Sequence, residues 1–412
     1  MRILVLTSTF PRWPGDREPP FVLELCRRLA AAHDVLVLSP HAPGAASEER
    51  MAERLSVRRF RYAPQGMESL AYEGGILEKL RKAPWRVLLV PGFLLAEAWA
   101  VFRAIRRDRP DVIHAHWIVP QGLVALLARL AARAGRQPPI VCTSHGGDLF
   151  ALRGRFASRL KTFTLQRAEA LTVVSTAMRQ AAVRLGAEAS RVRVMPMGVD
   201  ARERFFPRAD AARDPCEILF VGRLVEKKGV KFLLRALIRV RNSVPGAHLT
   251  VAGAGPLDAG LRAEARELGI DAKVRFLGAQ ANDMLPALYR RAAIVAVPSV
   301  VAASGDQEGL GLVIAEALAC ECPVVASDLP AIRDIVEHGT TGLLAQPGDV
   351  EDLAAKIVQL LLNPGLARDL GRRGRATVLE RFDWQHVGIE YERLLAAAAA
   401  GNSLNQLTLS TS

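Results

Sequence analysis

Short runs of Val, Ile and Leu alternate with longer amphipathic stretches along most of the chain. The runs are continuously apolar, which is typical of parallel strands that are covered on both faces. In the first half they predict strands at residues 3–9, 35–39, 57–62, 112–116, 140–144, 171–175 and 192–196. Amphipathic segments such as 21–31 and 121–133 predict the helices between them.

The alternation stops once and then restarts. Residues 201–215 are rich in charge, contain two prolines and lack periodicity, so they predict a linker. After them, strands are predicted at 218–221, 249–252, 274–277, 294–297, 324–326 and 342–344. We therefore expect an α/β fold of two doubly wound, Rossmann-like domains at 1–200 and 216–383. A last helix is predicted at about 384–400, and the polar residues 401–412 predict a disordered tail.

Length and composition support a two-domain globular protein. The 412 residues exceed what one hydrophobic core usually serves, and half of them are hydrophobic. The 55 Lys and Arg against 42 Asp and Glu give a formal charge of +13. This excess predicts an anionic partner, which leaves nucleic acid, a phosphorylated small molecule and an anionic membrane surface open.

The cysteines and the apolar segments predict the cellular compartment of the protein and whether it spans a membrane. The five cysteines are odd in number and scattered, so we expect reduced thiols in a cytoplasmic protein. The N-terminal apolar run is too short for a signal peptide. The longest apolar stretch, residues 87–102, is interrupted by Pro91, Gly92 and Glu97 and is shorter than the roughly 20 residues of a spanning helix. No membrane-spanning segment is predicted.

The densest candidate chemistry lies between residues 297 and 328. Glu308 falls in a loop after a predicted strand, and a helix is predicted to begin near Gly311. Glu316 lies inside that helix among apolar neighbours, although Glu is rarely buried unless it is paired. It either finds an Arg or a backbone donor in the core or is reserved for hydroxyl groups of a ligand. Glycines 309 and 311 would let backbone N–H groups approach a phosphate.

A second candidate segment follows the first strand of the second domain. Arg223 comes directly after the apolar run 218–221, and Lys227 and Lys228 precede a predicted helix. Fixed cations at a helix start would stabilise the charge of a departing diphosphate. The alternative is a solvated basic helix start, which is the default interpretation for Lys227.

With these segments the chain resembles glycosyltransferase family 4, a group of retaining enzymes with the GT-B fold. The resemblance rests on the Glu-x7-Glu pair and on the segments MRILVLTSTFPRWPGD, DVIHAHW, TSHGGD, VMPMGVD, ILFVGRLVEKKGV, VAGAGPL, VRFLG and FDWQHVGIEYERLL. It implies that the two Rossmann-like domains face each other across a cleft. It also implies that the last helix returns to pack on the first domain.

The resemblance also implies roles for individual residues. Glu308 would contact hydroxyls of the donor sugar and Glu316 the ribose, while Arg223 and Lys228 would bind the diphosphate. Gly311 and Leu312 would complete the donor site at the helix start. In the first domain, His145 would lie beside the reacting bond, and the backbone near Gly15 would cover the phosphates.

Several of these positions have a plainer interpretation. A simple turn explains Gly15 almost as well, and a lone His such as His145 is more often structural. His114 and His116 alternate on one predicted strand, so at least one should be a hydrogen-bonded core residue. Glu321 stands where the family usually has Gly, which would be unfavourable if the position requires a positive φ.

No resident metal or cofactor is predicted. The chain has no Asp-x-Asp motif, and the nearest approach, Asp306-Gln307-Glu308, uses a Glu that already has a role. Gly253-Ala-Gly255 suggests a dinucleotide loop, but Asp258 stands where the third glycine would be required. We therefore expect metal-independent chemistry on a UDP- or GDP-linked sugar, which is a co-substrate.

The sequence thus predicts a retaining glycosyltransferase that acts on a glycan or lipid-linked acceptor in bacterial cell-surface polysaccharide or glycolipid assembly. A nucleotide-sugar epimerase or hydrolase of the same fold stays open, as does a basic nucleic-acid-binding protein. Against the latter, aromatic residues make up only 6% and no nucleic-acid motif is present. The segment 153–167 places Phe156, Leu160 and Phe163 among basic residues, which predicts peripheral contact with the inner face of the cell membrane. An ordinary helix with a solvated basic face is the alternative.

Overall fold

The computed structural model describes residues 1–16, 18–72, 75–132, 137–152, 154–208 and 212–402. It divides into two compact units. Unit 1 comprises Met1–Pro196 and Val387–Ser412, and unit 2 comprises Met197–His386. Residues 403–412 of the expected tail and 209–211 of the expected linker lie outside the described residues.

Unit 1 is built on an eight-stranded sheet in the order β3-β4-β2-β1-β5-β6-β7-β8. Every pairing is parallel except that of β3 with β4. The strands are β1 (Arg2–Leu6), β2 (Asp34–Pro40), β3 (Glu48–Ala52), β4 (Leu55–Phe60), β5 (Val112–His116), β6 (Ile140–Ser144), β7 (Ala170–Val173) and β8 (Val192–Val194). Residues Ile3–Leu6, β5 and β6 are buried throughout, as expected for central parallel strands.

The edge strand β3 is the element that the hydrophobic pattern does not predict. Its sequence is EERMA, and its residues alternate between exposed and intermediate burial. It pairs antiparallel with β4 and ends the sheet. A charged strand at an edge discourages pairing with another chain, and it carries no apolar run for a sequence search to detect.

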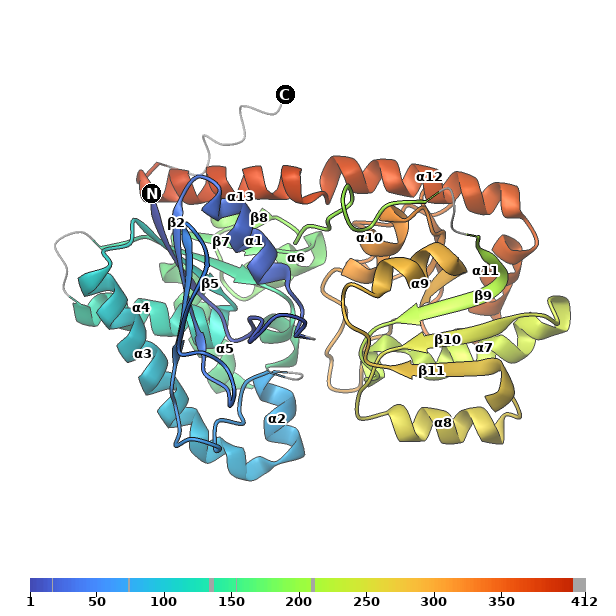
Figure 1. The fold of residues 1–412 in the computed structure, drawn as a ribbon, viewed down its shortest axis with the longest axis horizontal. Helices are drawn as coiled ribbons and strands as arrows, with labels where there is room; N and C mark the ends of the chain where they lie inside the picture. Colours follow the sequence, from blue (N-terminus) through green and yellow to red (C-terminus); the bar gives the residue numbers. More distant parts are fainter. Residues whose placement is uncertain (17, 73–74, 133–136, 153, 209–211, 403–412) are drawn as a thin grey trace. The chain divides into compact units, whose positions relative to one another are not determined.

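The helical segments of unit 1 connect these strands on both faces of the sheet (Figure 1). They are α1 (Phe21–Ala30), α2 (Ile76–Lys82), η1 (Pro84–Leu89), α3 (Val90–Arg107), η2 (Ile118–Gly122), α4 (Leu123–Ala132), η3 (Gly147–Ala151), α5 (Arg155–Arg167), α6 (Thr176–Arg184) and η4 (Ala189–Arg191). The last helix, α13 (Trp384–Ala399), belongs to unit 1 from Val387 onward. There the hydroxyl of Tyr391 donates to the backbone oxygen of Met195 at 3.1 Å.

The apolar stretch around α3 is longer than the sequence suggested. Residues Pro84–Arg107 form 24 helical residues that are long and apolar enough to cross a membrane by length and composition. Pro91 is accommodated because it lies in the first turn of α3. Glu97 is fully buried and accepts a hydrogen bond from Gln121 Nε2 at 3.2 Å; burial raises the pKa of this carboxyl to about 8. The inner face of α3 therefore packs as part of a folded domain.

Unit 2 contains a fully parallel six-stranded sheet in the order β11-β10-β9-β12-β13-β14. The strands are β9 (Asp214–Val221), β10 (His248–Ala252), β11 (Val274–Gly278), β12 (Ala292–Val297), β13 (Val324–Ser327) and β14 (Leu343–Ala345). The helical segments are η5 (Glu226–Lys228), α7 (Val230–Ser243), α8 (Asp258–Glu267), η6 (Asp271–Lys273), α9 (Leu285–Arg291), α10 (Leu312–Ala319), α11 (Val350–Leu361) and α12 (Pro364–Arg381). β9 begins at Asp214, so the end of the expected linker is already strand, and unit 2 takes in residues 197–200.

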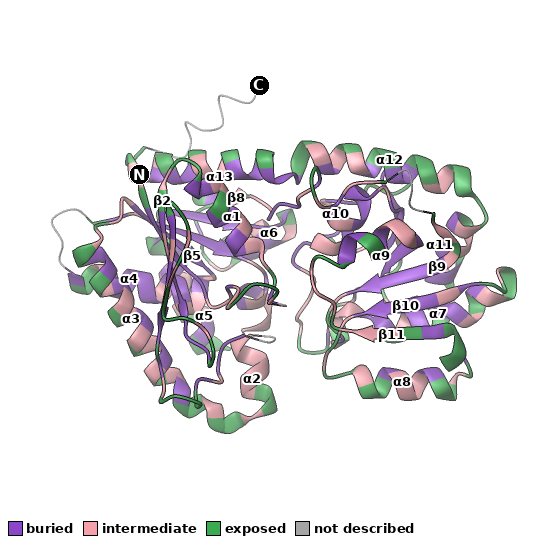
Figure 2. Ribbon diagram, in the orientation of Figure 1, coloured by how far each residue is buried: buried purple, intermediate pink, exposed green. Residues whose placement is uncertain are grey.

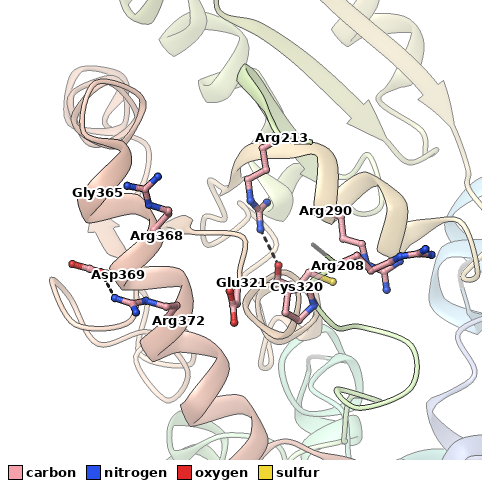
Figure 3. A pocket seen from close by; sticks show the side chains of 10 residues that line it. Arg208, Arg213, Arg290, Cys320, Glu321, Gly365, Arg368, Asp369 and Arg372 are labelled. Atoms are coloured by element: carbon pink, nitrogen blue, oxygen red, sulfur yellow. Dashed lines mark hydrogen bonds and ion pairs between the residues drawn. The ribbon is translucent and has the colours of Figure 1, made fainter. Parts of the chain in front are cut away.

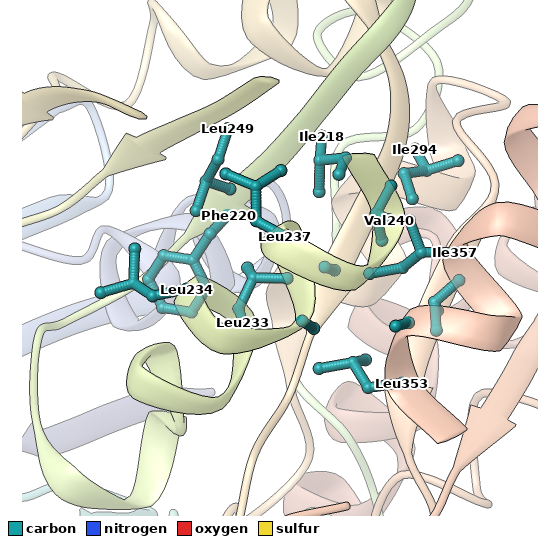
Figure 4. Close-up of a cluster of buried hydrophobic side chains, with 14 of the residues drawn as sticks. Ile218, Phe220, Leu233, Leu234, Leu237, Val240, Leu249, Ile294, Leu353 and Ile357 are labelled. Atoms are coloured by element: carbon teal, nitrogen blue, oxygen red, sulfur yellow. The ribbon is translucent and has the colours of Figure 1, made fainter. Parts of the chain in front are cut away.

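The core of unit 2 holds the sheet against α7 and α11. Leu233, Leu237 and Val240 on α7 meet Ile218 and Phe220 of β9 in one buried cluster (Figure 4). Leu353 and Ile357 of α11 join the same cluster. The central strand β9 is mostly buried, as Figure 2 shows, and this packing fixes the position of the loop that follows it.

Candidate functional site

The candidate residues of unit 2 lie where its strand order reverses. From the adjacent central strands β9 and β12, the chain builds outward to β10 and β11 on one side and to β13 and β14 on the other. Ligands of open α/β sheets bind beyond the carboxyl ends of the strands at such a reversal. The loop after β9 carries Arg223 and Lys228, and the loop after β12 carries Glu308.

These two loops meet backbone to backbone. Gly229 has a left-handed φ of 66°, and a Cβ atom there would overlap the carbonyl oxygen of Pro298. Beside this contact, the Val300 N–H donates to the Lys227 carbonyl at 2.8 Å. The Ala303 N–H donates to Oε1 of Glu226 at 3.0 Å. The glycine is therefore required for the close approach that brings the two loops into one site.

Lys228 and Glu308 form the central ion pair of this site. Their Nζ and Oε2 atoms lie 2.5 Å apart, and both side chains are largely buried. Burial by itself would raise the pKa of Glu308, but the charges of Lys228 and Lys227 and the Gly309 N–H hold that pKa below its ordinary value. Glu308 is thus a carboxylate at neutral pH, held next to a cation in a partly dry environment.

Lys227 has a role that the sequence did not predict. Its Nζ lies 3.1 Å from Asp306 Oδ1 and 3.2 Å from the Gln307 carbonyl oxygen. The default of a solvated basic helix start is therefore wrong, because this lysine ties down the loop that presents Glu308. Lys227 and Asp306 are 79 residues apart, so no local sequence pattern indicates this contact.

The other predicted donor residues of unit 2 lie close to Lys228 or to Glu308 in the sequence. Arg223 is exposed at the carboxyl end of β9. Gly311 has a left-handed φ of 89° and immediately precedes α10, whose first residue is Leu312. The helix thus begins near Gly311, as the sequence predicts, and a helix N-terminus is suited to an anion.

Glu316 lies on α10, where its Oε2 accepts a hydrogen bond from the Tyr289 hydroxyl at 2.8 Å. Burial raises the pKa of Glu316 to about 7, and the hydrogen bond and the charges of Arg204 and Lys228 only partly oppose this effect. No arginine forms an ion pair with Glu316 among the described residues, so its partner is a neutral hydroxyl. Glu308 and Glu316 therefore differ: one is held charged and the other titrates near neutrality.

In unit 1, Gly15 belongs to the loop that follows the central strand β1. Its φ is 77°, it is exposed, and a Cβ atom added to it would meet only open space. Arg12 and Asp16 close the loop through two contacts of 2.9 Å, Nε to Oδ2 and Nη2 to Oδ1. This arrangement accounts for a tight turn, and it leaves the backbone near Gly15 accessible to a ligand.

His145 follows β6 and is held in an aromatic environment. Its ring stacks on His116 at a centroid distance of 5.2 Å and contacts Phe21 and Trp117 at 4.8 and 5.0 Å. Burial, followed by the charge of His114, lowers the pKa of His145 to about 3. The imidazole is therefore neutral at physiological pH.

The contact with His116 fixes the tautomer of His145. His116 Nδ1 and His145 Nε2 lie 2.9 Å apart, while His116 Nε2 is buried without a partner among the described residues. We assign the shared proton to His116, because the reverse would bury an N–H donor that has no acceptor. His145 then carries its own proton on Nδ1. His114 and His116 are both fully buried, which confirms that this strand contributes core histidines.

Asp148 is a further residue whose role the sequence did not reveal. Its carboxylate accepts hydrogen bonds from the Ile118 N–H and from Ser144 Oγ, both at 2.7 Å. Burial raises the pKa of Asp148, and these hydrogen bonds oppose the rise. The residue joins the loops after β5 and β6 and so holds His145 and His116 in register.

Comparison with known proteins now decides the family. The profile named "Glycosyltransferase Family 4" matches residues 20–203, and the profile named "Glycosyl transferases group 1" matches residues 201–377. A GDP-mannose-dependent alpha-(1-6)-phosphatidylinositol monomannoside mannosyltransferase of Mycolicibacterium smegmatis is 31% identical over 350 residues, 81% of this chain and 89% of the relative. The chain is a family 4 glycosyltransferase. It is accordingly a retaining enzyme that uses a nucleotide-sugar donor.

Other relatives of this glycosyltransferase span nearly its full length. A glycogen synthase of Mycobacterium tuberculosis is 29% identical over 97% of this chain and 96% of its own. The fold matches sucrose-phosphate synthase from Thermosynechococcus elongatus with a TM-score of 0.79 and 24% identity, over 97% of this chain and all of that one. Anabaena Alr3699/HepE, solved in complex with UDP-glucose, matches with a TM-score of 0.73 and 21% identity, over 96% of this chain and all of that one. The predicted GT-B fold is confirmed.

Two further observations concern possible metal sites and a pocket of the glycosyltransferase. No group of three or more His, Cys, Asp or Glu side chains is placed to hold a metal in the described part of the chain. A pocket of about 500 Å³ in unit 2 is lined by Arg213, Arg368 and Glu321 but by none of the predicted donor residues (Figure 3). Arg213 is already committed there, since it donates to the carbonyls of Tyr289, Ala292 and Cys320.

The backbone conformation explains Gly253 and shows what position 321 requires. A Cβ atom at Gly253 would overlap the Gly222 carbonyl, so this glycine serves packing between the loops after β10 and β9. Glu321, where the family usually has Gly, has a φ of 54°. This chain therefore places a residue with a side chain in the left-handed region, where glycine is favoured.

Proposed function

We propose that the reversal point of unit 2 binds the nucleotide sugar through Arg223, Lys228, Glu308, Gly311, Leu312 and Glu316. The observation that carries this proposal is the Lys228–Glu308 pair. It joins a cation suited to a diphosphate and a carboxylate suited to sugar hydroxyls, and it lies where α/β sheets bind ligands. Glu316, whose oxygens are not held by a cation, is suited to the ribose hydroxyls.

In the proposed reaction, the acceptor hydroxyl attacks from the face that the diphosphate leaves, through a short-lived oxocarbenium-like species. The anomeric carbon–oxygen bond to the diphosphate breaks, and a new bond to the acceptor oxygen forms. The acceptor proton passes to the departing phosphate. Lys228 and Arg223 stabilise the charge that develops on this phosphate, without a resident metal. Gly15 and the neutral His145 act on the same donor, as the resemblance implies.

We infer that the acceptor is a lipid-linked sugar or a glycan in cell-surface polysaccharide or glycolipid assembly. The mannosyltransferase relative is named for a phosphatidylinositol monomannoside acceptor and for GDP-mannose. The excess of 13 positive charges favours a peripheral position on an anionic membrane face. The glycogen synthase relative supports a polysaccharide as the alternative acceptor.

Nucleotide binding tests the donor site directly. The melting temperature of the wild type and of Glu316→Ala is measured with saturating UDP, GDP and ADP in turn. A ligand at 100 times its dissociation constant stabilises by about 2.7 kcal/mol, which shifts melting by a few degrees. We expect one nucleotide to stabilise the wild type and the variant to lose that shift. If all three nucleotides leave the wild type unchanged, the proposed donor site is wrong.

Transfer and hydrolysis are then separated with the nucleotide sugar that the first experiment indicates. A glycosyltransferase consumes it mainly when an acceptor extract is present, whereas an epimerase or hydrolase consumes it alone. EDTA should leave the rate unchanged. A strict requirement for added Mg²⁺ or Mn²⁺ would contradict the metal-independent scheme.

A further inference from the structure

The outer face of the η1–α3 segment is apolar where a helix on a protein surface is usually polar. Leu88, Leu95 and Trp99 are 79%, 71% and 60% exposed, and Trp85 and Val87 are also more than half exposed. Leu95, Trp99 and Phe102 recur at intervals of four and three residues, so they share one side of the helix. The rings of Trp99 and Phe102 stack at 5.4 Å.

The opposite side of the same helix is the one that packs inside unit 1. Phe93, Val101, Ala104 and Ile105 are buried there, together with Glu97. The helix is therefore apolar on nearly all sides, although only one side has a protein partner among the described residues. A contiguous exposed apolar face of this kind marks an interaction surface. Figure 2 shows buried and exposed residues following each other along α3.

Positive charges lie at both ends of this apolar face. Arg81 and Lys82 end α2, and Arg103, Arg106 and Arg107 occupy the last turns of α3; all five are exposed. Between residues 76 and 107 the only acidic residues are Glu78 and Glu97. Glu97 is buried, and Glu78 pairs with Lys82 at 2.9 Å.

We propose that this surface, consisting of Leu88, Leu95, Trp99, Phe102 and the flanking basic residues, docks the enzyme on an anionic membrane. The apolar side chains enter the boundary between headgroups and acyl chains, tryptophan lies at that boundary, and the arginines meet anionic headgroups. The helix lies in the plane of the membrane and does not cross it, because its other side is occupied by the core of unit 1.

The charges favour a membrane over a second copy of the chain. A symmetric dimer through this face would bring two sets of arginines together, and like charges across an interface are unfavourable. An anionic bilayer instead satisfies the apolar centre and the basic ends together.

The same criteria weaken the membrane contact predicted for residues 153–167. In α5 the Lys161 side chain is buried, and its Nζ donates to the carbonyls of Leu149 and Leu152 at 3.0 and 2.8 Å. It is thus a structural residue of unit 1 and faces no headgroup. Phe156 is 76% exposed, but it is isolated from the α3 face in sequence and gives a matched control.

Vesicle binding of the intact protein tests the apolar part of the proposal. Vesicles of phosphatidylglycerol and phosphatidylcholine are compared with vesicles of phosphatidylcholine alone, in a cosedimentation experiment without any sugar substrate. The wild type should bind the anionic vesicles. The double variant Leu95→Ser/Trp99→Ser should lose at least about tenfold in partitioning, because it removes two large inserted side chains. Phe156→Ser should bind like the wild type.

The charge part is tested with a pair of double variants. Arg103→Glu/Arg106→Glu should weaken binding to anionic vesicles about tenfold or more and reduce its dependence on salt. Arg368→Glu/Arg372→Glu changes the net charge equally on exposed positions of unit 2 and should have little effect. Equal loss in both pairs would mean that only net charge matters and would overturn the proposed surface.

Two further results would also overturn it. One is unchanged binding of Leu95→Ser/Trp99→Ser when the variant melts like the wild type. The other is a wild-type dimer in light scattering that this variant converts to monomer. The inference rests on the proposed function only for the lipid-linked acceptor, and nucleotide-induced stabilisation of each variant reports on the donor site separately. Loss of vesicle binding with intact nucleotide binding, or the reverse, therefore identifies which proposal has failed.

Discussion

The two units organise their strand-end loops by different chemistry. In unit 2, lysines 227 and 228 pair with Asp306 and Glu308 across the loops after β9 and β12. In unit 1, the loops after β5 and β6 are joined by the buried carboxylate of Asp148 and by two neutral imidazoles, those of His116 and His145. The first arrangement gathers paired charges in the loops, and the second surrounds the histidines with neutral and aromatic groups.

This difference matches the two halves of a glycosyl transfer. A diphosphate brings and develops negative charge, so lysines that neighbouring carboxylates already hold in place are suited to bind it. In the proposed reaction the sugar carbon becomes electron-deficient, and a cationic histidine acting on the donor sugar would be unfavourable. Burial lowers the pKa of His145 to about 3, which makes this residue a neutral hydrogen-bond donor in the proposed reaction.

We call the paired loops of unit 2, with lysines 227 and 228, the charged half, and the loops of unit 1 that hold His116 and His145 the neutral half. Removing a cation from the charged half should have the largest effect. Lys228→Ala is expected to lower kcat/KM for the nucleotide sugar about 10²–10³-fold, because it removes the cation that we propose binds the leaving diphosphate. The same variant should weaken inhibition by the product nucleoside diphosphate. Steady-state kinetics with that nucleotide as inhibitor measure both effects, and Lys231→Ala on the exposed side of α7 is the matched control.

A double-mutant cycle with Glu308→Gln separates two origins of this loss. If Lys228 acts on the diphosphate itself, nucleoside diphosphate affinity falls in both backgrounds, and Glu308→Gln alone lowers the transfer rate but leaves that affinity unchanged. If Lys228 only positions Glu308, its removal has no further effect in the Glu308→Gln background. That second outcome would contradict the proposed role of the cation.

Removing the neutral His145 of unit 1 should have a smaller effect, and this effect should not depend on pH between 5 and 8. His145→Ala is expected to lower kcat about 10–100-fold, because it removes the neutral donor that the proposed function assigns to the donor sugar. Because the pKa of His145 lies at about 3, the ratio of wild-type to variant rate should stay constant between pH 5 and 8. Rates for His386→Ala, an exposed histidine of unit 2, provide the control. A ratio that changes with a midpoint near 6.5 would show that His145 titrates and that the neutral description is wrong.

Glu316 gives a stability effect of intermediate size. Burial raises its pKa to about 7 from an ordinary value of 4.5, so the folded protein binds this proton more tightly than the unfolded chain. The associated stability is complete below about pH 4.5 and is lost as the pH rises through 7. Glu316→Gln keeps an acceptor for the Tyr289 hydroxyl and cannot ionise.

The variant Glu316→Gln should therefore gain stability over the wild type by about 1–3 kcal/mol between pH 5 and pH 8. Urea denaturation of both proteins across this pH range measures the change. Nucleotide affinity should fall in the same variant, because the proposed ribose carboxylate is lost. Stability curves that run parallel across the pH range would mean that the carboxyl is ionised throughout, as Glu308 is.

The charged half was more accessible to sequence reasoning than the neutral half. In unit 2, Arg223 and Lys228 lie between β9 and the next α-helix, and Glu308 lies between β12 and α10, so the strand pattern places these three residues beyond the carboxyl ends of adjacent strands. The start of α10 beside Gly311 was predicted correctly for the same reason. The partner of Lys227 was not predicted, because it depends on how two loops about 80 residues apart pack.

The neutral half depends on contacts that no local pattern encodes. His116 and His145 are 29 residues apart, and their contact follows from the pairing of β5 with β6. The polar edge strand β3 and the exposed face of α3 were missed for a related reason. A hydrophobic run does not tell which of its sides the tertiary structure leaves uncovered, and a strand without such a run leaves no apolar signal.

The smallest expected effect concerns a residue of unit 2 that is outside the charged loops. Glu321 has a φ of 54°, where a side chain costs roughly 1–2 kcal/mol and glycine does not. Glycine also gains more freedom in the unfolded chain, by about 0.5–1 kcal/mol, so Glu321→Gly should be more stable than the wild type by about 0.5–1 kcal/mol. Glu321→Ala is the control, since it removes the carboxylate but keeps the Cβ atom. Chemical denaturation should show a gain in stability for Glu321→Gly alone, while nucleotide affinity stays unchanged because no donor residue is altered.

A similar gain for Glu321→Ala would trace the effect to the carboxylate in the arginine-lined pocket, and a loss of stability in both variants would show that this carboxylate stabilises the arginines around it. Either result would mean that charges of unit 2 matter well beyond the loops after β9 and β12, which would remove the sharp division between the two halves of the enzyme.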